Sequence, residues 1–224
     1  MALYSNTNEI VDTKEFTYFD KGNCAKVYSN GEILLKVYNH DCDYRFFLKK
    51  NMFDLLKKLN LPSIVKLHDY YFYFTDWFHK FLSMDAYTMD LVKGDNIPLL
   101  DYDRTHLIEA LKDLEETLEI LSDNHIVLWD VNPRNIIISS NGITIIDPDQ
   151  FFKSRFHSKK RIYESNKKEL INCLNSTLFL ETLKRENMVS TSFIINSKNS
   201  SFIDDVSNSL HDDTFYHSMK SKHR

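Results

Sequence analysis

The chain of 224 residues is long enough to bury a sizeable core, and its 42% hydrophobic content with only four glycines and four prolines excludes a disordered or low-complexity protein. The formal net charge of -4 excludes a general attraction to nucleic acid or to anionic membranes. We therefore expect one globular domain or one two-lobed unit, with no nucleic-acid partner and no membrane span.

The first part of the chain is predicted to be rich in β-strands. Residues 16 to 38 alternate apolar and polar side chains on both sides of Asn30-Gly31, which is the pattern of a β-hairpin with a two-residue turn. The aromatic stretch 69 to 75 and the stretch 86 to 92 are predicted as two further strands. Together these segments predict a small sheet.

One helix is predicted between these strands, in the segment RFFLKKNMFDLLKKLNLP, residues 45 to 62. Its apolar residues recur near helical spacing, and Pro62 closes the segment. The apolar residues are Phe46, Phe47, Met52, Leu55, Leu56 and Leu59. We therefore expect a β-rich lobe with a single helix over residues 1–93.

From residue 94 onward the pattern becomes helical. Asp101 or Asp103 can cap a helix over residues 101 to 123, and a further helix is expected around Tyr163 to Arg185. The inward faces are Leu107, Ile108, Leu111, Leu114, Leu118 and Leu121 in the first helix, and Leu170, Leu174, Leu178 and Leu183 in the second. The sequence thus predicts an α+β protein whose second lobe, residues 94–224, is helical.

The strongest chemical pattern lies in residues 125 to 149, HIVLWDVNPRNIIISSNGITIIDPD. Asp130, Asn135 and Asp147 supply three oxygen ligands at intervals that suit magnesium and a phosphoryl transfer. Residues 136 to 138 are predicted as a strand, and a turn at Asn141-Gly142 leads into a second strand that ends just before Asp147.

In this order the parts resemble the protein-kinase superfamily over roughly residues 16 to 150, in a small and divergent form. The resemblance implies a two-lobed kinase-like fold with a reduced helical C-terminal lobe. It also implies that Asp130 accepts or orients the proton of the acceptor hydroxyl, and that Asn135 and Asp147 bind Mg²⁺ with ATP as co-substrate.

The segment FDKGNCAKVY stands where that family has its glycine-rich loop. Gly22 remains of the three usual glycines, with Asp20 and Ala25 at the other two positions and Val27 in register. Lys36 follows an apolar run and matches the strand lysine that grips the α and β phosphates. Without this context, a solvent-facing strand lysine would be the commoner interpretation.

The carboxylate partner of Lys36 is the weakest point of the match. The family's helix supplies a Glu, whereas Met52 stands at that position here. Asp54 or Asp43 could substitute. Without such a carboxylate, Lys36 must be oriented by other groups, or the resting state is inactive.

The stretch AYTMDLVKGDNIP resembles the family's hinge between the lobes. Met89 would be the gatekeeper, and the backbone of Asp90 and Val92 would read the adenine edge. A strand followed by a turn at Lys93-Gly94 explains the same residues.

Several residues depart from the family's pattern. Leu128 and Trp129 replace the usual His and Arg, and Asn132 replaces a Lys. Without that Lys, Arg134 could help Lys36 and magnesium to stabilise the γ-phosphoryl. Pro148 in the Asp-Pro-Asp motif restricts the backbone there, and Asp149 is either a further metal ligand or a solvated side chain.

The segment after this motif leaves the acceptor open. Residues 153 to 161, KSRFHSKKR, form either a solvated basic loop or a docking site for an acidic or phosphorylated acceptor. No Ala-Pro-Glu motif follows, which removes the usual platform for a peptide. We expect transfer of the ATP γ-phosphoryl to a protein Ser or Thr. The alternatives are a small-molecule kinase of the same superfamily and an inactive pseudokinase that acts as a binding module.

The cysteines and the N-terminus bear on localisation. Cys24, Cys42 and Cys173 are an odd number without paired spacing, so we expect neither a disulfide framework nor a zinc site. The first thirty residues lack the apolar core of a signal peptide, and no apolar run reaches the roughly 18 residues of a membrane helix. These features favour a cytoplasmic protein in a reducing compartment, or one exported without such a signal.

Overall fold

The structure, a computed structural model, describes residues 2–39, 41–43, 47–74, 84–93, 104–129, 131–139, 142–149, 151–186, 202 and 206. The chain divides into two compact units. The first comprises Met1–Val92 with Asp147–Phe152, and the second Lys93–Ile146 with Lys153–Arg224. The short segment that carries Asp147 and Asp149 therefore belongs to the same unit as Lys36.

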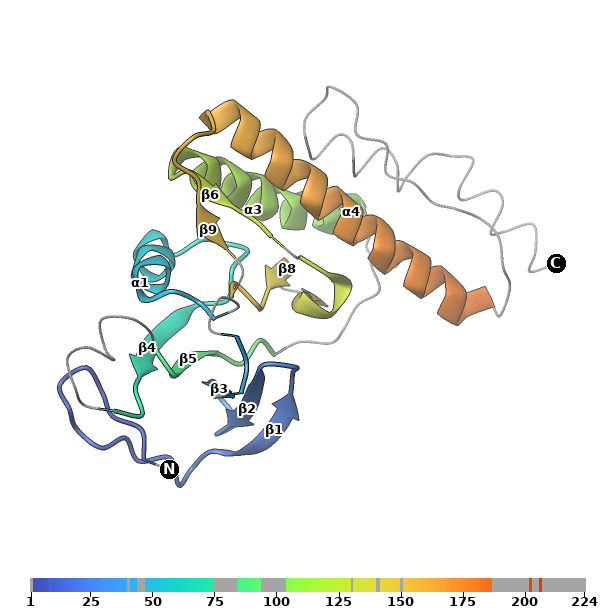
Figure 1. Cartoon of the computed structure of the whole chain (residues 1–224). Coiled ribbons are helices and arrows are strands. Elements are labelled where there is room, and N and C mark those ends of the chain that lie inside the picture. The colour runs from blue at the N-terminus through green and yellow to red at the C-terminus, as the bar shows by residue number, and fades with distance from the viewer. Residues whose placement is uncertain are drawn as a thin grey trace. The chain divides into compact units, whose positions relative to one another are not determined.

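The predicted α+β composition is confirmed. Figure 1 labels most of the elements. In chain order they are β1 (Thr17–Lys21), β2 (Ala25–Ser29), β3 (Ile33–Tyr38), α1 (Lys50–Leu59), β4 (Leu67–Tyr71), β5 (Ala86–Asp90), α3 (Arg104–Asp123), β6 (Ile126–Val127), the 3-10 helix η3 (Pro133–Asn135), β7 (Ile136–Ser139), β8 (Gly142–Ile145), β9 (Phe152–Lys153) and α4 (Lys159–Glu186).

The first unit is built on a five-stranded antiparallel sheet in the order β1-β2-β3-β5-β4. The predicted hairpin around Asn30-Gly31 is confirmed as the β2-β3 pair. Gly31 has a φ of 94°, which favours glycine, and the Asn30 side chain accepts hydrogen bonds from the backbone N–H groups of Glu32 and Ile33. The turn chemistry thus fixes the register that places Lys36.

The two faces of this sheet carry different side chains. On one face Leu35 and Ala86 pack with Leu3 in an apolar cluster. Side chains alternate between faces along a strand, so Lys36 and Tyr38 belong to the other face. Tyr87 joins them there, because it lies opposite Lys36 in the β3-β5 register. A lysine on this second face lies among aromatic rings, away from water.

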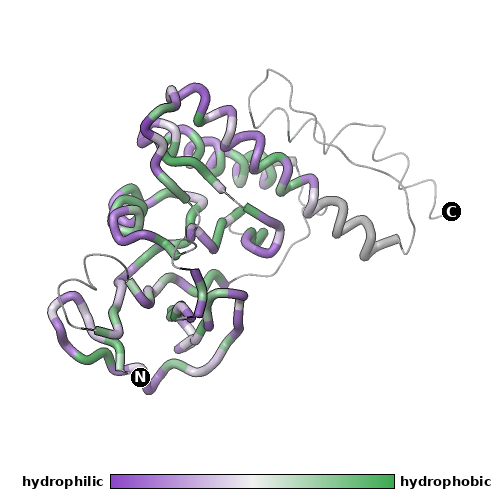
Figure 2. Tube along the Cα trace, viewed as in Figure 1, coloured by the Kyte–Doolittle hydropathy of each residue, from purple (hydrophilic) through white to green (hydrophobic). Residues whose placement is uncertain are grey.

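Helix α1 packs on the sheet through Met52, Phe53 and Leu56, which are all buried. The ring of Phe53 makes edge contacts with Tyr70 on β4 and Tyr87 on β5. Hydrophobic and hydrophilic stretches alternate around the helix in Figure 2. The predicted helix is confirmed, but it begins only at Lys50.

The chain before β1 was not predicted to be structured, yet it is tied to the edge of the sheet. Tyr4 and Phe72 exchange backbone hydrogen bonds, with N to O distances of 2.7 and 2.9 Å. Leu3, 4% exposed, enters the apolar cluster. This segment covers the sheet face opposite Lys36.

In the second unit α3 and α4 run side by side (Figure 1). The predicted leucine face of α3 is confirmed. Its five leucines are fully buried, namely Leu107, Leu111, Leu114, Leu118 and Leu121. Leu170 and Leu174 on α4 are buried as predicted. Within the described part of the chain, no helix is long and apolar enough to cross a membrane.

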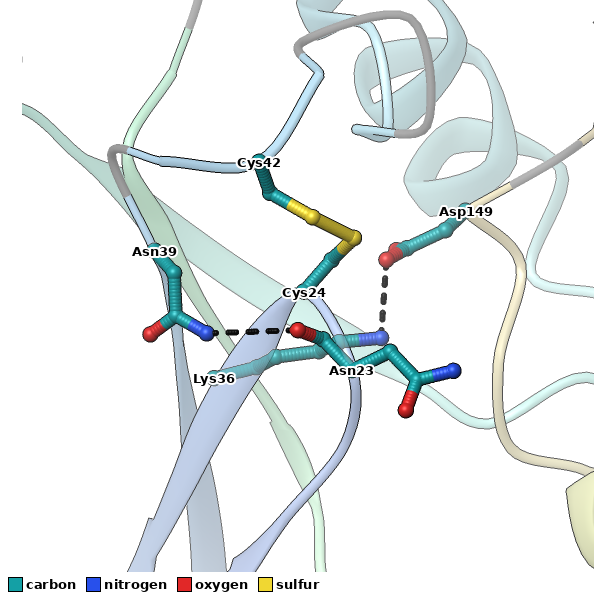
Figure 3. The surroundings of a disulfide bond; sticks show 6 residues. All are labelled: Asn23, Cys24, Lys36, Asn39, Cys42 and Asp149. Carbon is teal, nitrogen blue, oxygen red and sulfur yellow. Dashed lines mark hydrogen bonds and ion pairs between the residues drawn. A yellow bond between two sulfur atoms is a disulfide. The ribbon is translucent and has the colours of Figure 1, made fainter.

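The expectation of unpaired cysteines is wrong for two of the three. Cys24 and Cys42 form a disulfide with a Cα to Cα distance of 5.4 Å (Figure 3). The pair closes the open end of the β2-β3 hairpin, where Ala25 lies opposite Tyr38. The cysteine pattern therefore no longer argues for a reducing compartment, because persistent disulfides are typical of oxidising ones. Cys173 is free and buried.

Candidate functional site

Lys36 is the centre of the candidate site. It lies on β3, opposite Val27 on β2 and Tyr87 on β5, and only 8% of its surface is exposed. Its ammonium lies 6.0 Å from the ring centroid of Tyr38 and 5.8 Å from that of Tyr87. A buried lysine needs compensating charge, because the loss of hydration otherwise favours its neutral form.

Two carboxylates supply that charge. Lys36 Nζ lies 2.8 Å from Asp147 Oδ1 and 2.8 Å from Asp149 Oδ2. Figure 3 shows the contact with Asp149 beside the disulfide. Both acids come from the Asp-Pro-Asp segment, 111 residues further along the chain in the case of Asp147. Tertiary folding thus joins three of the residues that the sequence analysis names as site candidates, Lys36, Asp147 and Asp149.

Asp149 has partners besides Lys36. Its Oδ1 accepts hydrogen bonds from the hydroxyls of Tyr38 and Tyr87, each at 2.9 Å. The Tyr38 hydroxyl in turn accepts one from the backbone N–H of Leu48, at 2.9 Å. The side chain is 10% exposed, so the interpretation of Asp149 as a solvated residue is wrong. Its role as a metal ligand stays a prediction.

The charges of this cluster depend on burial and on one another. Burial lowers the pKa of Lys36, but the charges of Asp149 and Asp147 outweigh it, and the pKa lies above the usual 10.5. Burial raises the pKa of Asp149 above 3.8, against the opposing charge of Lys36. Burial and the charge of Asp149 raise the pKa of Tyr38 and Tyr87 well above 10.0. Both tyrosines are therefore neutral hydrogen-bond donors at neutral pH.

Asp147 differs from Asp149 in its access to solvent. Its side chain is 33% exposed, and among the described residues its side-chain contacts all fall on Oδ1. One is the ion pair with Lys36, and the other is a 3.3 Å hydrogen bond from the backbone N–H of Asp149. Asp147 Oδ2 is thus the carboxylate oxygen of this pair that can accept a further ligand.

The two acids suggested as partners of Lys36 do not pair with it. Asp54 is exposed on α1, and the contacts of Lys36 do not include Asp43. Met52, at the position of the family's Glu, is buried in the core. The interpretation that Asp43 or Asp54 orients Lys36 is therefore wrong. Sequence spacing could not reveal Asp149 as the partner, because that contact depends on the tertiary fold.

Gly22 lies in the tight connection between β1 and β2. Its backbone N–H donates to the carbonyl of Ala25 at 2.9 Å, and a Cβ built on Gly22 would meet only that oxygen, at 3.9 Å. The local fold therefore does not require a glycine here. A glycine that the fold does not need is free to serve close approach by a ligand.

The predicted hinge residues form the end of β5 and the residues after it. Met89 is buried, 4% exposed, and pairs in register with Leu34. The backbone N–H of Asp90 donates to the carbonyl of Lys66, and its carboxylate contacts His68. Val92 is partly exposed, and its adenine-reading role stays a prediction.

In the second unit, a side chain on α4 holds the strand that precedes the predicted catalytic loop. Asp130 lies outside the described residues. The buried side chain of Asn166, on α4, accepts a hydrogen bond from Leu128 N–H at 2.9 Å and donates one to the carbonyl of Ile126 at 2.9 Å. Sequence reasoning did not identify Asn166. It fixes the strand that leads toward Asp130.

Asn135 closes η3 and opens the β7-β8 hairpin. Its carbonyl accepts a hydrogen bond from the backbone N–H of Ile146 at 2.9 Å, and Ile146 immediately precedes Asp147 in the chain. Asn132 caps η3, since its side chain accepts from Arg134 N–H at 3.0 Å. The hairpin therefore sets the chain path between these two predicted metal ligands.

No group of three or more His, Cys, Asp or Glu that could hold a metal occurs among the described residues. The donors predicted here would not form such a group, because one of them is an amide. The ligand role of Asn135 and Asp147 stays a prediction.

Comparison with known proteins adds no identity to this site: no family model matches the chain, and no curated protein matches it either.

Proposed function

We propose that the chain is an ATP-dependent phosphotransferase with a two-lobed kinase-like fold and a reduced helical C-terminal lobe. The observation that carries the proposal is the 2.8 Å contact between Lys36 on β3 and Asp147. The resemblance gives these two residues the phosphate-binding and magnesium-binding roles.

The burial of this cluster supports a functional role. A lysine and two carboxylates are costly to remove from water, and apolar side chains of similar volume usually stabilise a fold as well or better. Buried ionisable groups with shifted pKa values cluster at functional sites. Lys36, Asp147 and Asp149 carry a formal charge of about -1 when all three are ionised, which favours a bound cation.

In the proposed reaction, Lys36 binds the α and β phosphates and Asp130 orients the acceptor hydroxyl. A bond forms between the hydroxyl oxygen and the γ-phosphorus as the bond to the bridging β-γ oxygen breaks. The proton passes to the Asp130 carboxylate and the electron pair leaves with ADP. Positioning and electrostatics supply most of the rate.

The donor chemistry of the site fits magnesium. Carboxylate and amide oxygens of Asp147 and Asn135 are hard ligands of the kind that Mg²⁺ prefers. When bound with ATP, Mg²⁺ would offset charge on the phosphates during transfer. The side chain of Asp147 is one-third exposed, so its carboxylate can exchange the contact with Lys36 for one with Mg²⁺.

We propose a protein Ser or Thr as the acceptor, with a small molecule as the alternative. The segment before and at the start of α4 supports the first choice, because its basic side chains are exposed. They are Lys153, Arg155, Lys159, Lys160 and Arg161. Lys159 pairs with Asp123 at 2.8 Å, and an acidic acceptor segment could engage the others.

One observation favours the alternative of a binding module without turnover. Lys36 Nζ lies 2.8 Å from a carboxylate oxygen of both Asp147 and Asp149. Phosphates must compete with at least one of them, and the single Gly22 in the loop offers less close approach than three glycines. Such a protein would bind nucleotide weakly or not at all and would transfer no phosphoryl group.

Transfer of labelled γ-phosphate from Mg-ATP tests the proposal. The parent chain is incubated with itself, with a mixture of Ser and Thr peptides of acidic sequence, and with small hydroxyl compounds. We expect labelling that Asp147→Asn abolishes and that Asp54→Asn leaves unchanged, because Asp54 is exposed on α1. Labelling by Asp147→Asn at the parent rate would refute the site. No labelling, together with weak or no binding of Mg-ATP, would favour the binding module.

A further inference from the structure

We propose that Asp149 is the positioning carboxylate of Lys36, taking the place of the helix acid that this chain lacks, and that Tyr38 and Tyr87 hold Asp149 in place. The inference rests on the proposed function, since it assigns the group that presents Lys36 to phosphates. It gives Asp149 a role different from that of a metal ligand.

The contacts of Asp149 support this role. One oxygen faces Lys36 Nζ at 2.8 Å, and the other accepts both tyrosine hydroxyls at 2.9 Å. Each oxygen is therefore engaged by donors of the protein itself. A metal ion would have to displace these donors inside a region that is 10% exposed.

The donors that hold Asp149 are themselves fixed. Leu48 N–H donates to the Tyr38 hydroxyl, which directs the hydroxyl proton toward Asp149. The Tyr38 ring stacks on Phe47 with centroids 4.0 Å apart. Tyr87 is fully buried and contacts Phe53. Rings packed in this way cannot rotate freely, so they define one position for the carboxylate.

Asp147 and Asp149 can therefore have different roles at Lys36. A lysine side chain is flexible, and an ammonium held by Asp147 alone would lose its anchor when that carboxylate turned to a metal. Asp149 does not also bind the metal, so it keeps Lys36 Nζ in place. Asp147, 33% exposed and with contacts on one oxygen only, can exchange its partner.

This anchor is independent of any acid on α1. The acid on that helix, Asp54, is exposed, and α1 contacts Tyr87 through the ring of Phe53. Tyr38 and Tyr87 instead come from β3 and β5, which pair in the sheet. Positioning of Lys36 should therefore not require a movement of α1.

A double-mutant cycle on ADP binding tests the inference without any turnover. ADP affinity is measured by calorimetry, with Mg²⁺ and with EDTA, for the parent, Lys36→Met, Asp149→Asn and the double variant. We expect Asp149→Asn to weaken ADP binding at least about tenfold, and to have no further effect once Lys36 is Met. The loss should be the same with Mg²⁺ and with EDTA.

Two further variants, Tyr87→Phe and Tyr38→Phe, each remove only a hydroxyl. They test the same role if Asp149→Asn has a folding defect. Each should weaken ADP binding less than Asp149→Asn, again only when Lys36 is present. Asp54→Asn is the control on α1 and should leave affinity unchanged. Circular dichroism verifies that each variant is folded.

Two results would overturn the inference while the proposed function stands. An equal loss in the Lys36→Met background would show that Asp149 acts on the fold in general. A loss that appears only with Mg²⁺ and persists without Lys36 would make Asp149 a metal ligand. If the parent fails to bind ADP, or if Lys36→Met binds it as well as the parent, the proposed function itself fails.

Discussion

Lys36 on β3 lies opposite Tyr87 on β5, and the side chains of both residues contact the same carboxylate, that of Asp149. The antiparallel register of two strands thus places a cation and a neutral hydrogen-bond donor around one buried acid. This arrangement explains how the chain can hold Lys36 in a defined position although residue 52 is a methionine and not an acid. Tyr87 on β5 thus contacts the carboxylate that pairs with Lys36.

The buried groups Tyr38, Tyr87 and Lys36 should make the stability of the protein fall at alkaline pH. The folded state keeps the protons of Tyr38 and Tyr87 above pH 10.0, and that of Lys36 above pH 10.5, whereas the unfolded chain releases them. The free energy of unfolding should therefore fall as pH rises above these values, by up to about 1.4 kcal/mol per pH unit for each group. Urea unfolding between about pH 9 and pH 11 measures this slope.

The matched variants for this measurement are Tyr87→Phe and Tyr18→Phe. Tyr87→Phe removes one of the titrating groups and should make the alkaline slope shallower. Tyr18, 59% exposed on β1, contacts Tyr28 and lies away from the cluster, so its variant should keep the parent slope. Equal slopes for Tyr87→Phe and the parent would argue against a buried, neutral Tyr87.

Gly22→Ala should separate stability from nucleotide binding. The backbone of Gly22 does not need a left-handed conformation, and an added Cβ has room. Alanine restricts the unfolded chain and should raise stability by about 0.4 to 1 kcal/mol. The same methyl group should weaken ATP binding severalfold, because it keeps phosphates away from the loop backbone.

Thermal unfolding and calorimetric titration with Mg-ATP check the two effects of Gly22→Ala on the same preparation. Unchanged ATP affinity together with the expected gain in stability would show that phosphates do not approach this loop.

Asn166→Ala should destabilise the second unit. It leaves the buried N–H of Leu128 and carbonyl of Ile126 without their side-chain partner, at a cost of about 3 kcal/mol. Asn172→Ala, at an exposed position on the same helix, is the control and should change stability little. Urea unfolding of the three proteins compares them, and similar midpoints for Asn166→Ala and Asn172→Ala would contradict the role of Asn166.

Thiol counting should confirm the disulfide. Unfolded but unreduced protein should react with Ellman's reagent at one cysteine, Cys173, and reduced protein at three. In the folded state Cys173 should be unreactive, because burial, with the charge of Glu169, raises the pKa of its thiol to about 12. Three reactive thiols before reduction would mean that Cys24 and Cys42 are not joined.

Reduction should also destabilise the first unit. The disulfide joins residues separated by 18 positions, and closure of a loop of that length contributes about 3 kcal/mol. Cys24→Ser with Cys42→Ser should unfold at lower urea concentration than the parent, by the same amount as reduction does. Cys173→Ala, which keeps the disulfide, is the control for the loss of a cysteine.

The sequence could predict elements whose signals are local. Asn30-Gly31 marks a two-residue turn by its backbone preferences, and the leucines of α3 mark its buried face by their spacing. The motifs indicate Lys36, Asp147 and Asp149 as site residues, and Lys36 lies in contact with both acids. Local patterns therefore predict the hairpin, the main helices and the three charged residues of the cluster, but not Tyr38 and Tyr87.

The residues that sequence reasoning missed depend on contacts between distant segments. Tyr38 could have been suspected, because it lies two residues after Lys36 and so on the same face of a strand. The place of Tyr87 follows from a strand register that no local pattern reveals. Cys24 and Cys42 flank the two arms of a predicted hairpin, and counting outward from its turn would have suggested their proximity.

The most direct measurement is calorimetric titration of ATP, with Mg²⁺ and with EDTA, into the parent chain, Lys36→Met and Asp147→Asn. If Lys36 binds phosphates and Asp147 binds the metal, the parent should bind ATP more tightly with Mg²⁺. Lys36→Met should weaken binding under both conditions, and Asp147→Asn should remove the gain from Mg²⁺. Binding by both variants that equals the parent's, or no binding by the parent, would contradict the site.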